Sequence, residues 1–273
     1  MKKFLSLLLV SVLLMGVMAH HAFAENADTS LDAILAKGEL ILGLDDNFPP
    51  MGFRDPDTND IVGYDIDLAA EVAARLGVTL VCQPIDWGAK ELELNSGNID
   101  CIWNGMSITP EREESMAMSL PYMNNKIVLV AKADSGVASL ADLAGKSVAV
   151  QNDSYAQELL ETDAAYADVY AVAEELVYDD YLTALMDLQQ GGVDAVLIDL
   201  VVAEYRLNGL GDDSLIIVQE LDDDLYGIGF RKADEALRDK VNALLLEMAQ
   251  DGAIEAISDK WFGRNISIVG EAE

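Results

Sequence analysis

Short apolar runs alternate with amphipathic segments along the first part of the chain, and this order predicts parallel α/β structure. Helical spacing of apolar residues stops at Gly77 in one segment and at Gly97 in the next, and glycine is common just past a helix end. The expected strands span residues 40–44, 78–85 and 99–103, and the expected helices span residues 65–75 and 89–95. A β-α-β-α-β order requires right-handed crossovers, so we expect a parallel sheet with helices on both faces.

The same alternation recurs after Pro121 and predicts a second unit. Here the expected strands span residues 127–131, 147–150 and 195–198, and the expected helices span residues 155–161 and 180–190. The chain then returns through a strand over 227–230 to a helix over 234–250 and one more helix. Two such units imply two lobes. Because ligands bind these sheets beyond the carboxyl ends of strands, we expect the loops 104–109 and 151–155 to face each other across a cleft.

Residues 103–112, which read Trp-Asn-Gly-Met-Ser-Ile-Thr-Pro-Glu-Arg, predict a strand end, a turn and the start of a helix. Thr109 is a suitable N-cap and Pro110 a suitable first helical residue, while Gly105 lets the backbone approach a ligand. Arg112 then lies one turn inside the helix, where its forked guanidinium matches a carboxylate. A lone arginine is more often part of a surface ion pair, and the glutamates that follow could supply one. The segment is therefore a candidate carboxylate site whose interpretation depends on the rest of the chain.

The first 24 residues have the pattern of a secretory signal peptide. Two lysines precede an apolar stretch over 4–18, and Ala22-Phe23-Ala24 is a small-residue cleavage site. We expect cleavage after Ala24 and a periplasmic protein, because neither cysteine stands near this junction to carry a lipid. No later apolar run approaches the roughly 18 uncharged residues that span a bilayer.

Removal of the signal segment changes both the charge and the available chemistry. It takes away two lysines and no acidic residue, so the net charge goes from −32 to −34 and nucleic acid becomes a poor partner. It also takes away His20 and His21, the only histidines of the chain. The remaining sequence lacks the residues for Ser/His/Asp or Cys/His catalysis and for a His-ligated metal. We therefore expect neither an enzyme nor a bound cofactor or metal.

Two further features favour structural interpretations. Cys82 and Cys101 could form a disulfide in an oxidising compartment, but each falls within an expected strand, with another strand placed between them. We therefore expect unbonded, buried thiols. The three consecutive aspartates at 222–224 lack the spacing of a cation site, so a solvated acidic loop is the expected structure there.

Six segments, in their order and spacing, resemble the polar amino-acid solute-binding proteins of bacterial ABC importers (extracellular solute-binding protein family 3), the family that includes the glutamine-binding and lysine/arginine/ornithine-binding proteins. These segments are residues 42–53, 62–68, 84–87, 103–112, 196–199 and 260–263. The resemblance implies a type II periplasmic-binding-protein fold, in which two α/β lobes are joined by two hinge strands. The implied division is a large lobe of residues 25–121 plus 227–273, a small lobe of residues 127–221, and hinge strands at 122–126 and 222–226.

The resemblance also implies ligand-binding roles. Arg112 would clamp the α-carboxylate of an amino acid with help from Ser107, and Asp199 of the small lobe would neutralise the α-ammonium. Phe48 and Trp87 would flank the carbon chain. The charges agree with this assignment, because a zwitterion in a low-dielectric cleft needs one partner of each sign. The complete expected set is Asp45, Phe48, Trp87, Asn104, Gly105, Met106, Ser107, Arg112, Gln151, Ser154, Tyr155 and Asp199.

Ligand choice would rest on residues near the side-chain end of the ligand. Gln151 and Tyr155 stand where the glutamine-binding protein has a lysine and a glycine, so this wall is bulkier and less positive. Asp45, with Asp46 as an alternate, stands where the lysine/arginine type places a carboxylate, although either could be a plain turn residue. We expect a cationic amino acid such as arginine, with cystine and glutamine as alternatives and a dehydratase on the same fold as a more distant one.

The resemblance implies two partners. One is a free amino acid, which would contact both lobes only when the hinge is closed and would therefore shift the population towards the closed form. The other is an ABC permease of the inner membrane, which would recognise that form. The protein itself is expected to be a monomer.

Overall fold

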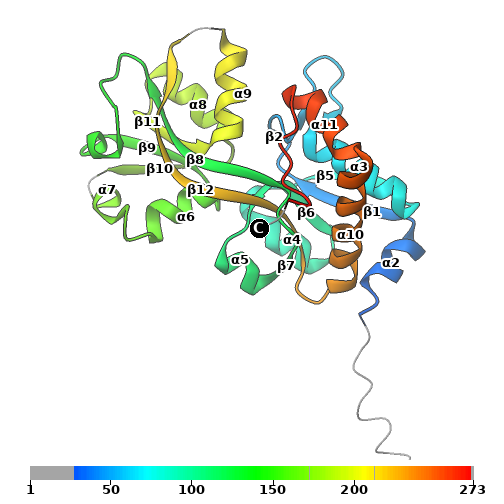
Figure 1. Cartoon of the computed structure of the whole chain (residues 1–273). Coiled ribbons are helices and arrows are strands. Elements are labelled where there is room, and N and C mark those ends of the chain that lie inside the picture. The colour runs from blue at the N-terminus through cyan, green and yellow to red at the C-terminus, as the bar shows by residue number, and fades with distance from the viewer. Residues whose placement is uncertain (1–27, 172, 212, 272–273) are drawn as a thin grey trace, which may run out of the picture.

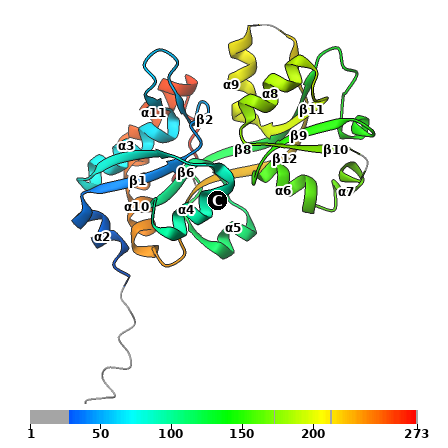
Figure 2. The ribbon, with the colours of Figure 1, turned by 180° about the vertical axis from the view of Figure 1, so that it is seen from behind.

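Two long strands run side by side between two α/β lobes, as both views show (Figures 1 and 2). The computed structural model describes residues 28–171, 173–211 and 213–271, so the expected signal segment lies outside the described residues. The helices are α2 (Ser30–Lys37), α3 (Tyr64–Leu76), α4 (Lys90–Ser96), α5 (Pro110–Ser115), α6 (Tyr155–Thr162), α7 (Ala167–Tyr170), α8 (Tyr181–Gln190), α9 (Leu200–Leu210), α10 (Glu235–Asp251) and α11 (Ala253–Phe262), with short 3₁₀ turns η1 (Trp87–Ala89) and η2 (Leu140–Leu143). Within these ranges, no helix has both the length and the apolar character that crossing a bilayer requires.

The strands form one large sheet and one small one. The strands are β1 (Glu39–Leu44), β2 (Asn47–Phe48), β3 (Gly52–Arg54), β4 (Ile61–Val62), β5 (Thr79–Pro84), β6 (Cys101–Ser107), β7 (Met116–Met118), β8 (Met123–Lys132), β9 (Ser147–Gln151), β10 (Glu174–Tyr178), β11 (Ala195–Asp199) and β12 (Leu215–Arg231). The large sheet has the order β10-β9-β11-β8-β12-β6-β1-β5, with β7 also paired to β12, and β2, β3 and β4 form the small sheet. Strands β8 and β12 pair antiparallel from Lys132 and Leu215 to Met123 and Tyr226.

Each lobe is built around its own part of the sheet. The first lobe contains β1 to β7 with α2 to α5, α10 and α11, and the second contains β9 to β11 with α6 to α9 (Figure 1). Both views place α8 and α9 on one side of the second lobe's strands and α6 and α7 on the other (Figures 1 and 2). In the first lobe, β5 and β6 both pair parallel with β1, as the sequence pattern predicts.

The core explains why these apolar runs become strands. Leu40, Leu42 and Leu44 alternate along β1 and are fully buried in one cluster with the apolar face of α3. Ile41 lies between them and packs on the opposite cluster, which includes Trp87. Both faces of the parallel strands are therefore covered, and each fully buried leucine contributes roughly 1.5–3 kcal/mol.

The structure corrects three local expectations and adds elements that were not predicted. Strand β6 continues to Ser107, so residues 104–107 are strand and not turn. Strand β12 starts at Leu215 instead of residue 227, and it therefore includes the three aspartates. The expected solvated loop is right for Asp223, whose side chain is 89% exposed, and wrong for Asp224, which is 6% exposed. Helices α7 and α9 and strand β10 were not predicted at all.

The two cysteines are unbonded, as expected. Cys82 of β5 and Cys101 of β6 are both paired with Leu42, from opposite sides of β1, so that strand separates them. Burial raises the pKa of the Cys82 thiol to about 11 and that of Cys101 further. Both thiols are therefore protonated and unreactive at neutral pH.

Candidate ligand-binding site

A small cavity lies between the lobes, and ten of the twelve expected ligand-binding residues line it. The lining residues are Phe48, Trp87, Asn104, Gly105, Ser107, Arg112, Gln151, Ser154, Tyr155 and Asp199. The first six belong to the first lobe and the last four to the second. The free space is about 10 Å³, close to the least that holds one water molecule. The lobes are therefore closed on each other in this conformation.

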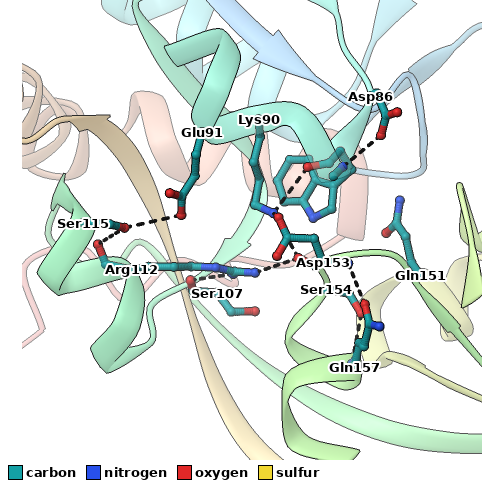
Figure 3. A network of polar contacts seen from close by, with 12 residues as sticks. Asp86, Lys90, Glu91, Ser107, Arg112, Ser115, Gln151, Asp153, Ser154 and Gln157 are labelled. Carbon is teal, nitrogen blue, oxygen red and sulfur yellow. Dashed lines mark hydrogen bonds and ion pairs between the residues drawn. The ribbon is translucent and has the colours of Figure 1, made fainter. Parts of the chain in front are cut away.

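Arg112 is held at the cavity by main-chain carbonyls. Thr109 caps α5 by accepting a hydrogen bond from the Arg112 amide at 3.3 Å, which fixes the first turn. The buried guanidinium donates to the Ser107 carbonyl at 2.9 Å and, across the lobes, to the Asp153 carbonyl at 3.1 Å (Figure 3). Within the described part of the chain it forms no ion pair, so the surface pair with a neighbouring glutamate is not found. The positive charge of Arg112 is thus still available to an anion.

Gly105 lies within β6 and lines the cavity. Its φ is +57°, and its amide donates to Asp65 Oδ2 at 2.7 Å. The Tyr122 hydroxyl donates to the same oxygen at 3.0 Å, and burial raises the pKa of Asp65 to about 7. Asp65 was not among the expected site residues. In the sequence, Asp65 appears only as an acidic residue in the first turn of a helix. Acidic residues are common there because they stabilise the helix dipole, so the pattern does not indicate a site.

Replacement of Gly105 by alanine is expected to destabilise the protein by about 2–4 kcal/mol, from a disfavoured φ and a steric overlap. An added Cβ would lie 2.7 Å from Phe48 Cε1 and 3.1 Å from Tyr226 Cε2. The matched control is Gly97→Ala, since Gly97 has φ +80° but no atom within 4 Å of the added carbon. Urea unfolding should show a smaller loss of unfolding free energy for the control, because only the disfavoured φ contributes there. Equal costs for both variants would show that space around Gly105 is not limiting.

Asp199 ends β11 at the opposite side of the cavity and belongs to a hydrogen-bonded group. Its Oδ1 accepts from Tyr226 at 2.7 Å and from Asn125 Nδ2 at 2.8 Å. Asn125 Nδ2 also donates to Asp224 Oδ2 at 2.9 Å, and Ser107 Oγ donates to the same oxygen at 2.9 Å. Burial raises the pKa of Asp199 to about 7, and the charge of Asp224 acts in the same direction. Asn125 and Asp224 were not predicted as site residues.

The polar groups of the second lobe are already engaged. Ser154 caps α6 by accepting from the Gln157 amide at 3.1 Å, and the Tyr155 hydroxyl donates to Asp222 at 2.6 Å. Gln151 Nε2 donates to Asp45 Oδ2 of the first lobe at 2.8 Å. These three side chains therefore shape the cavity wall and connect it to β12 and to the other lobe.

Two expected residues, Asp45 and Met106, do not line the cavity. Asp45 is buried beside it and accepts from Gln151, and burial raises the pKa of its carboxyl to about 6. Met106 points away, because side chains alternate along β6, and it packs in the core cluster that contains Trp87. The alternate carboxylate, Asp46, instead forms an ion pair with Arg54 at 2.6 Å.

Lys90 joins the lobes at the edge of the cavity. Its side chain is 1% exposed, lies over the Trp87 ring at 4.8 Å, and donates to both the carbonyl and the carboxylate of Asp153 (Figure 3). Burial lowers the pKa of Lys90 to about 8, and the nearby charge of Arg112 adds to this. Sequence reasoning missed Lys90, because a lysine at a helix start normally points into solvent and here the opposite lobe covers it.

Comparisons with known proteins agree with this geometry. The model of the bacterial extracellular solute-binding proteins, family 3, matches residues 40–264. The L-cystine-binding protein TcyJ of Escherichia coli K12 is 30% identical over 94% of each chain, and the arginine-binding extracellular protein ArtP of Bacillus subtilis is 29% identical over 96% of this chain and 98% of that one. The crystal structure of an ABC uptake transporter substrate-binding protein from Streptococcus pneumoniae with bound histidine superposes with a TM-score of 0.83. It is 36% identical and covers 89% of this chain and 99% of its own.

These matches confirm the expected type II periplasmic-binding-protein fold, since they extend over both lobes and over the strands between them. The matched length exceeds half of the chain, and the relatives are matched over nearly their whole length. The chain therefore belongs to the bacterial extracellular solute-binding proteins, family 3.

Proposed function

We propose that this protein binds a free amino acid in the cavity between its lobes and delivers it to an ABC permease. The observation that carries the proposal is the pair of opposite charges on opposite lobes, the unpaired guanidinium of Arg112 and the buried carboxylate of Asp199. An amino-acid zwitterion satisfies both at once. The similar proteins include binding proteins for cystine and arginine and a substrate-binding protein with bound histidine, which supports an amino acid as the ligand class.

Each wall of the cavity takes one part of the ligand in this proposal. Arg112, with Ser107 and Ser154, holds the α-carboxylate, and Asp199 holds the α-ammonium together with the backbone of residues 104–105. Phe48 and Trp87, both buried at the cavity, flank the carbon chain. Asp45 and Gln151 lie beyond them and determine which side chain is accepted, because their mutual hydrogen bond can open to admit a polar group.

Ligand entry requires the lobes to separate, because about 10 Å³ of free space admits no amino acid. We assign this motion to residues 122–126, which include the start of β8, and to residues 222–226 of β12, where the two strands that connect the lobes leave the first lobe. The moving bodies are then residues 25–121 with 227–273, and residues 127–221. The contacts that would break are those of Asp153 with Arg112 and Lys90, and that of Gln151 with Asp45.

Replacing Lys90 with methionine should weaken ligand binding about tenfold, mainly through faster dissociation. Methionine keeps an apolar contact with Trp87 but loses the charged hydrogen bonds to Asp153, which contribute on the order of 1.5–3 kcal/mol to the closed form. Stopped-flow measurement of dissociation would test this. The control is Lys260→Met, because Lys260 also lies over a tryptophan, Trp261, and pairs with an aspartate, but within the first lobe. An unchanged dissociation rate in the Lys90 variant would show that the contact between Lys90 and Asp153 does not stabilise the closed form.

A cationic amino acid such as arginine is the proposed ligand, with cystine and glutamine as alternatives. Asp45 lies beside the cavity, bonded to its lining residue Gln151, and Arg112 is the one cation among the described lining residues. The groove outside Arg112 is also acidic, since Glu91, Glu111, Glu158 and Glu161 line it. Such a field attracts cations and repels glutamate and aspartate.

Thermal unfolding of ligand-stripped protein against the twenty amino acids and cystine tests the function. A true ligand at about 100 times its Kd should add roughly 2.7 kcal/mol of stability. Arginine should be among the stabilising ligands, and Asp45→Asn should reduce its effect more than that of glutamine. If no amino acid raises the melting temperature, the proposed function is wrong. Conversion of a stabilising amino acid into a product would instead favour the dehydratase alternative.

A further inference from the structure

Two buried carboxylates meet beside the cavity, one from each of two neighbouring elements. Asp199 ends β11 and Asp224 lies in β12, and the two side chains are 5% and 6% exposed. One amide nitrogen, Asn125 Nδ2, donates to both, at 2.8 Å to Asp199 Oδ1 and at 2.9 Å to Asp224 Oδ2. The two oxygens are therefore no farther apart than the sum of these distances, about 5.7 Å.

The donors around this carboxylate pair are all neutral. Besides Asn125, they are the Tyr226 hydroxyl for Asp199, and Ser107 Oγ and the Leu225 amide for Asp224. No lysine or arginine of the described residues forms an ion pair with either carboxylate. Asn125 Oδ1 is itself buried and has no hydrogen-bond partner in the described structure. Two negative charges would thus be buried together without a directly paired counter-ion, which is unfavourable.

Among the described residues, no element packed against the pair places a cation in direct contact with it. Burial raises the pKa of Asp224 and the positive charge of Arg112 of α5 lowers it, but the guanidinium donates to the carbonyls of Ser107 and Asp153 and forms no direct ion pair with Asp199 or Asp224 in the described residues. Tyr181 of α8 and Tyr155 of α6 face the pair, and burial raises the pKa of both, so they stay neutral. Asp222, which binds Tyr155, adds a further negative charge. A proton is the remaining way to reduce the charge of the empty site.

We propose that Asp199 and Asp224 share one proton when the site is empty, and that the ammonium group of the ligand displaces this proton to solvent. The proposal rests on the proposed function, in which Asp199 meets that ammonium. The O–H bond of the protonated carboxyl breaks, the proton passes to water or buffer, and the carboxylate pairs with the entering cation. One positive charge enters as one leaves. Asp224 is a positioning residue in this exchange: it keeps the proton on Asp199 and sets the pH range in which the site binds.

The exchange predicts how ligand affinity depends on pH. Burial and the charge of Asp224 raise the pKa of Asp199 to about 7. Above that pH the Asp199 carboxylate is already ionised, and ligand affinity does not depend on pH. Below it the ligand must displace a proton, so affinity falls by about tenfold for each pH unit, the effect of one bound proton. Removing the charge of Asp224 should move the start of this fall to lower pH.

Carbon-13 NMR of the ligand-free full chain, labelled at aspartate Cγ and titrated from pH 4 to 9, tests the shared proton directly. We expect one carboxyl with a midpoint near 7 that disappears in Asp199→Asn, which separates it from Asp45 and Asp65. The midpoint should fall in Asp224→Asn and in Asp224→Ser, each checked for folding by circular dichroism. The matched control is Asp223→Asn, which removes an exposed charge from the neighbouring position and should leave the midpoint unchanged. A midpoint below 5.5 for Asp199, or one that Asp224 variants do not move, would overturn the proposal.

Calorimetric titration with arginine, in two buffers of different ionisation enthalpy, tests the displacement. At pH 6 close to one proton should be released for each arginine bound, and at pH 8.5 almost none; Asp224→Asn should release less at pH 6. Binding at pH 6 without proton release contradicts the exchange. If no amino acid binds at any pH, the proposed function fails and the displacement with it, whereas the NMR titration decides separately whether Asp224 holds the proton on Asp199.

Discussion

Replacing Arg112 with alanine should reduce amino-acid affinity by at least about 100-fold. Arg112 is the one cation among the described lining residues, so the ligand carboxylate would lose its partner, and an unpaired buried charge costs on the order of 3–5 kcal/mol. The loss should be almost as large for Arg112→Lys, because a single ammonium cannot reproduce the two bonds that the guanidinium fork makes to separate carbonyls while it also holds a ligand. Isothermal titration with the ligand from the thermal screen measures both values.

The matched control for Arg112 is Arg75→Ala. Arg75 also forms charged hydrogen bonds, to Glu71 and Asp251, but it lies on α3 and does not line the cavity. Its removal should lower stability slightly and leave affinity within a factor of two or so. If Arg112→Ala binds as well as the control, the guanidinium is not the carboxylate site, and the assignment of the cavity fails.

Asp199→Asn should change binding and stability in opposite directions. Amino-acid affinity at pH 8 should fall by about 100-fold or more, because the ammonium would be buried without the carboxylate that pairs with it directly. The empty protein should become more stable at that pH, since asparagine keeps the shape and a hydrogen-bonding oxygen but removes one of two adjacent buried charges. Titration calorimetry and thermal unfolding of the same samples measure the two effects.

The stability gain of Asp199→Asn should depend on pH with a definite sign. The folded pKa of Asp199 is raised from about 4 to about 7, so the wild-type protein binds this proton more tightly folded than unfolded. Wild-type stability is therefore lost as the pH rises from 4 to 7, and the variant does not share that loss. The two melting temperatures should be similar at pH 4 and differ by several degrees at pH 8, about 2–4 °C per kcal/mol. A difference that does not change with pH would contradict the buried-charge explanation.

The sequence predicts those elements of the fold whose signals are local. Strand β1 and helix α3 have clear apolar periods, and α3, α4 and α8 end at glycines with left-handed φ values. Helix α9 was missed because it follows β11 without a break and begins with the apolar run Leu200-Val201-Val202, which has no helical period of its own. The apolar pattern found strand β12 only over residues 227–230, because three consecutive aspartates, which strands usually disfavour, precede that run; a strand at 222–226 was expected from the family resemblance alone.

Residues of the candidate site likewise fall into those that local sequence signals predict and those that they do not. Arg112 and Gly105 lie in a segment whose cap, turn and charge signals are contiguous, so their location at the cavity could be anticipated. Lys90 and Asp224 could not, because each is buried by an element distant in sequence, the loop at Asp153 for Lys90 and the residues Ser107 and Asn125 for Asp224. The sequence shows which charged residues the chain contains. Which of them are buried at the cavity depends on contacts with elements distant in sequence.

The central position of β12 also sets the order in which the chain can fold. In the large sheet β12 separates β6 of the first lobe from β8, and α10 and α11, which follow it, pack against α2 and α3 near the start of the described chain. Neither lobe is then an autonomous folding unit. A chain that ended before residue 215 would leave β6 and β8 with open edges, which invite aggregation. Native folding must wait for the last segments to be synthesised, and the long sequence separation of these strand pairs makes that step slow.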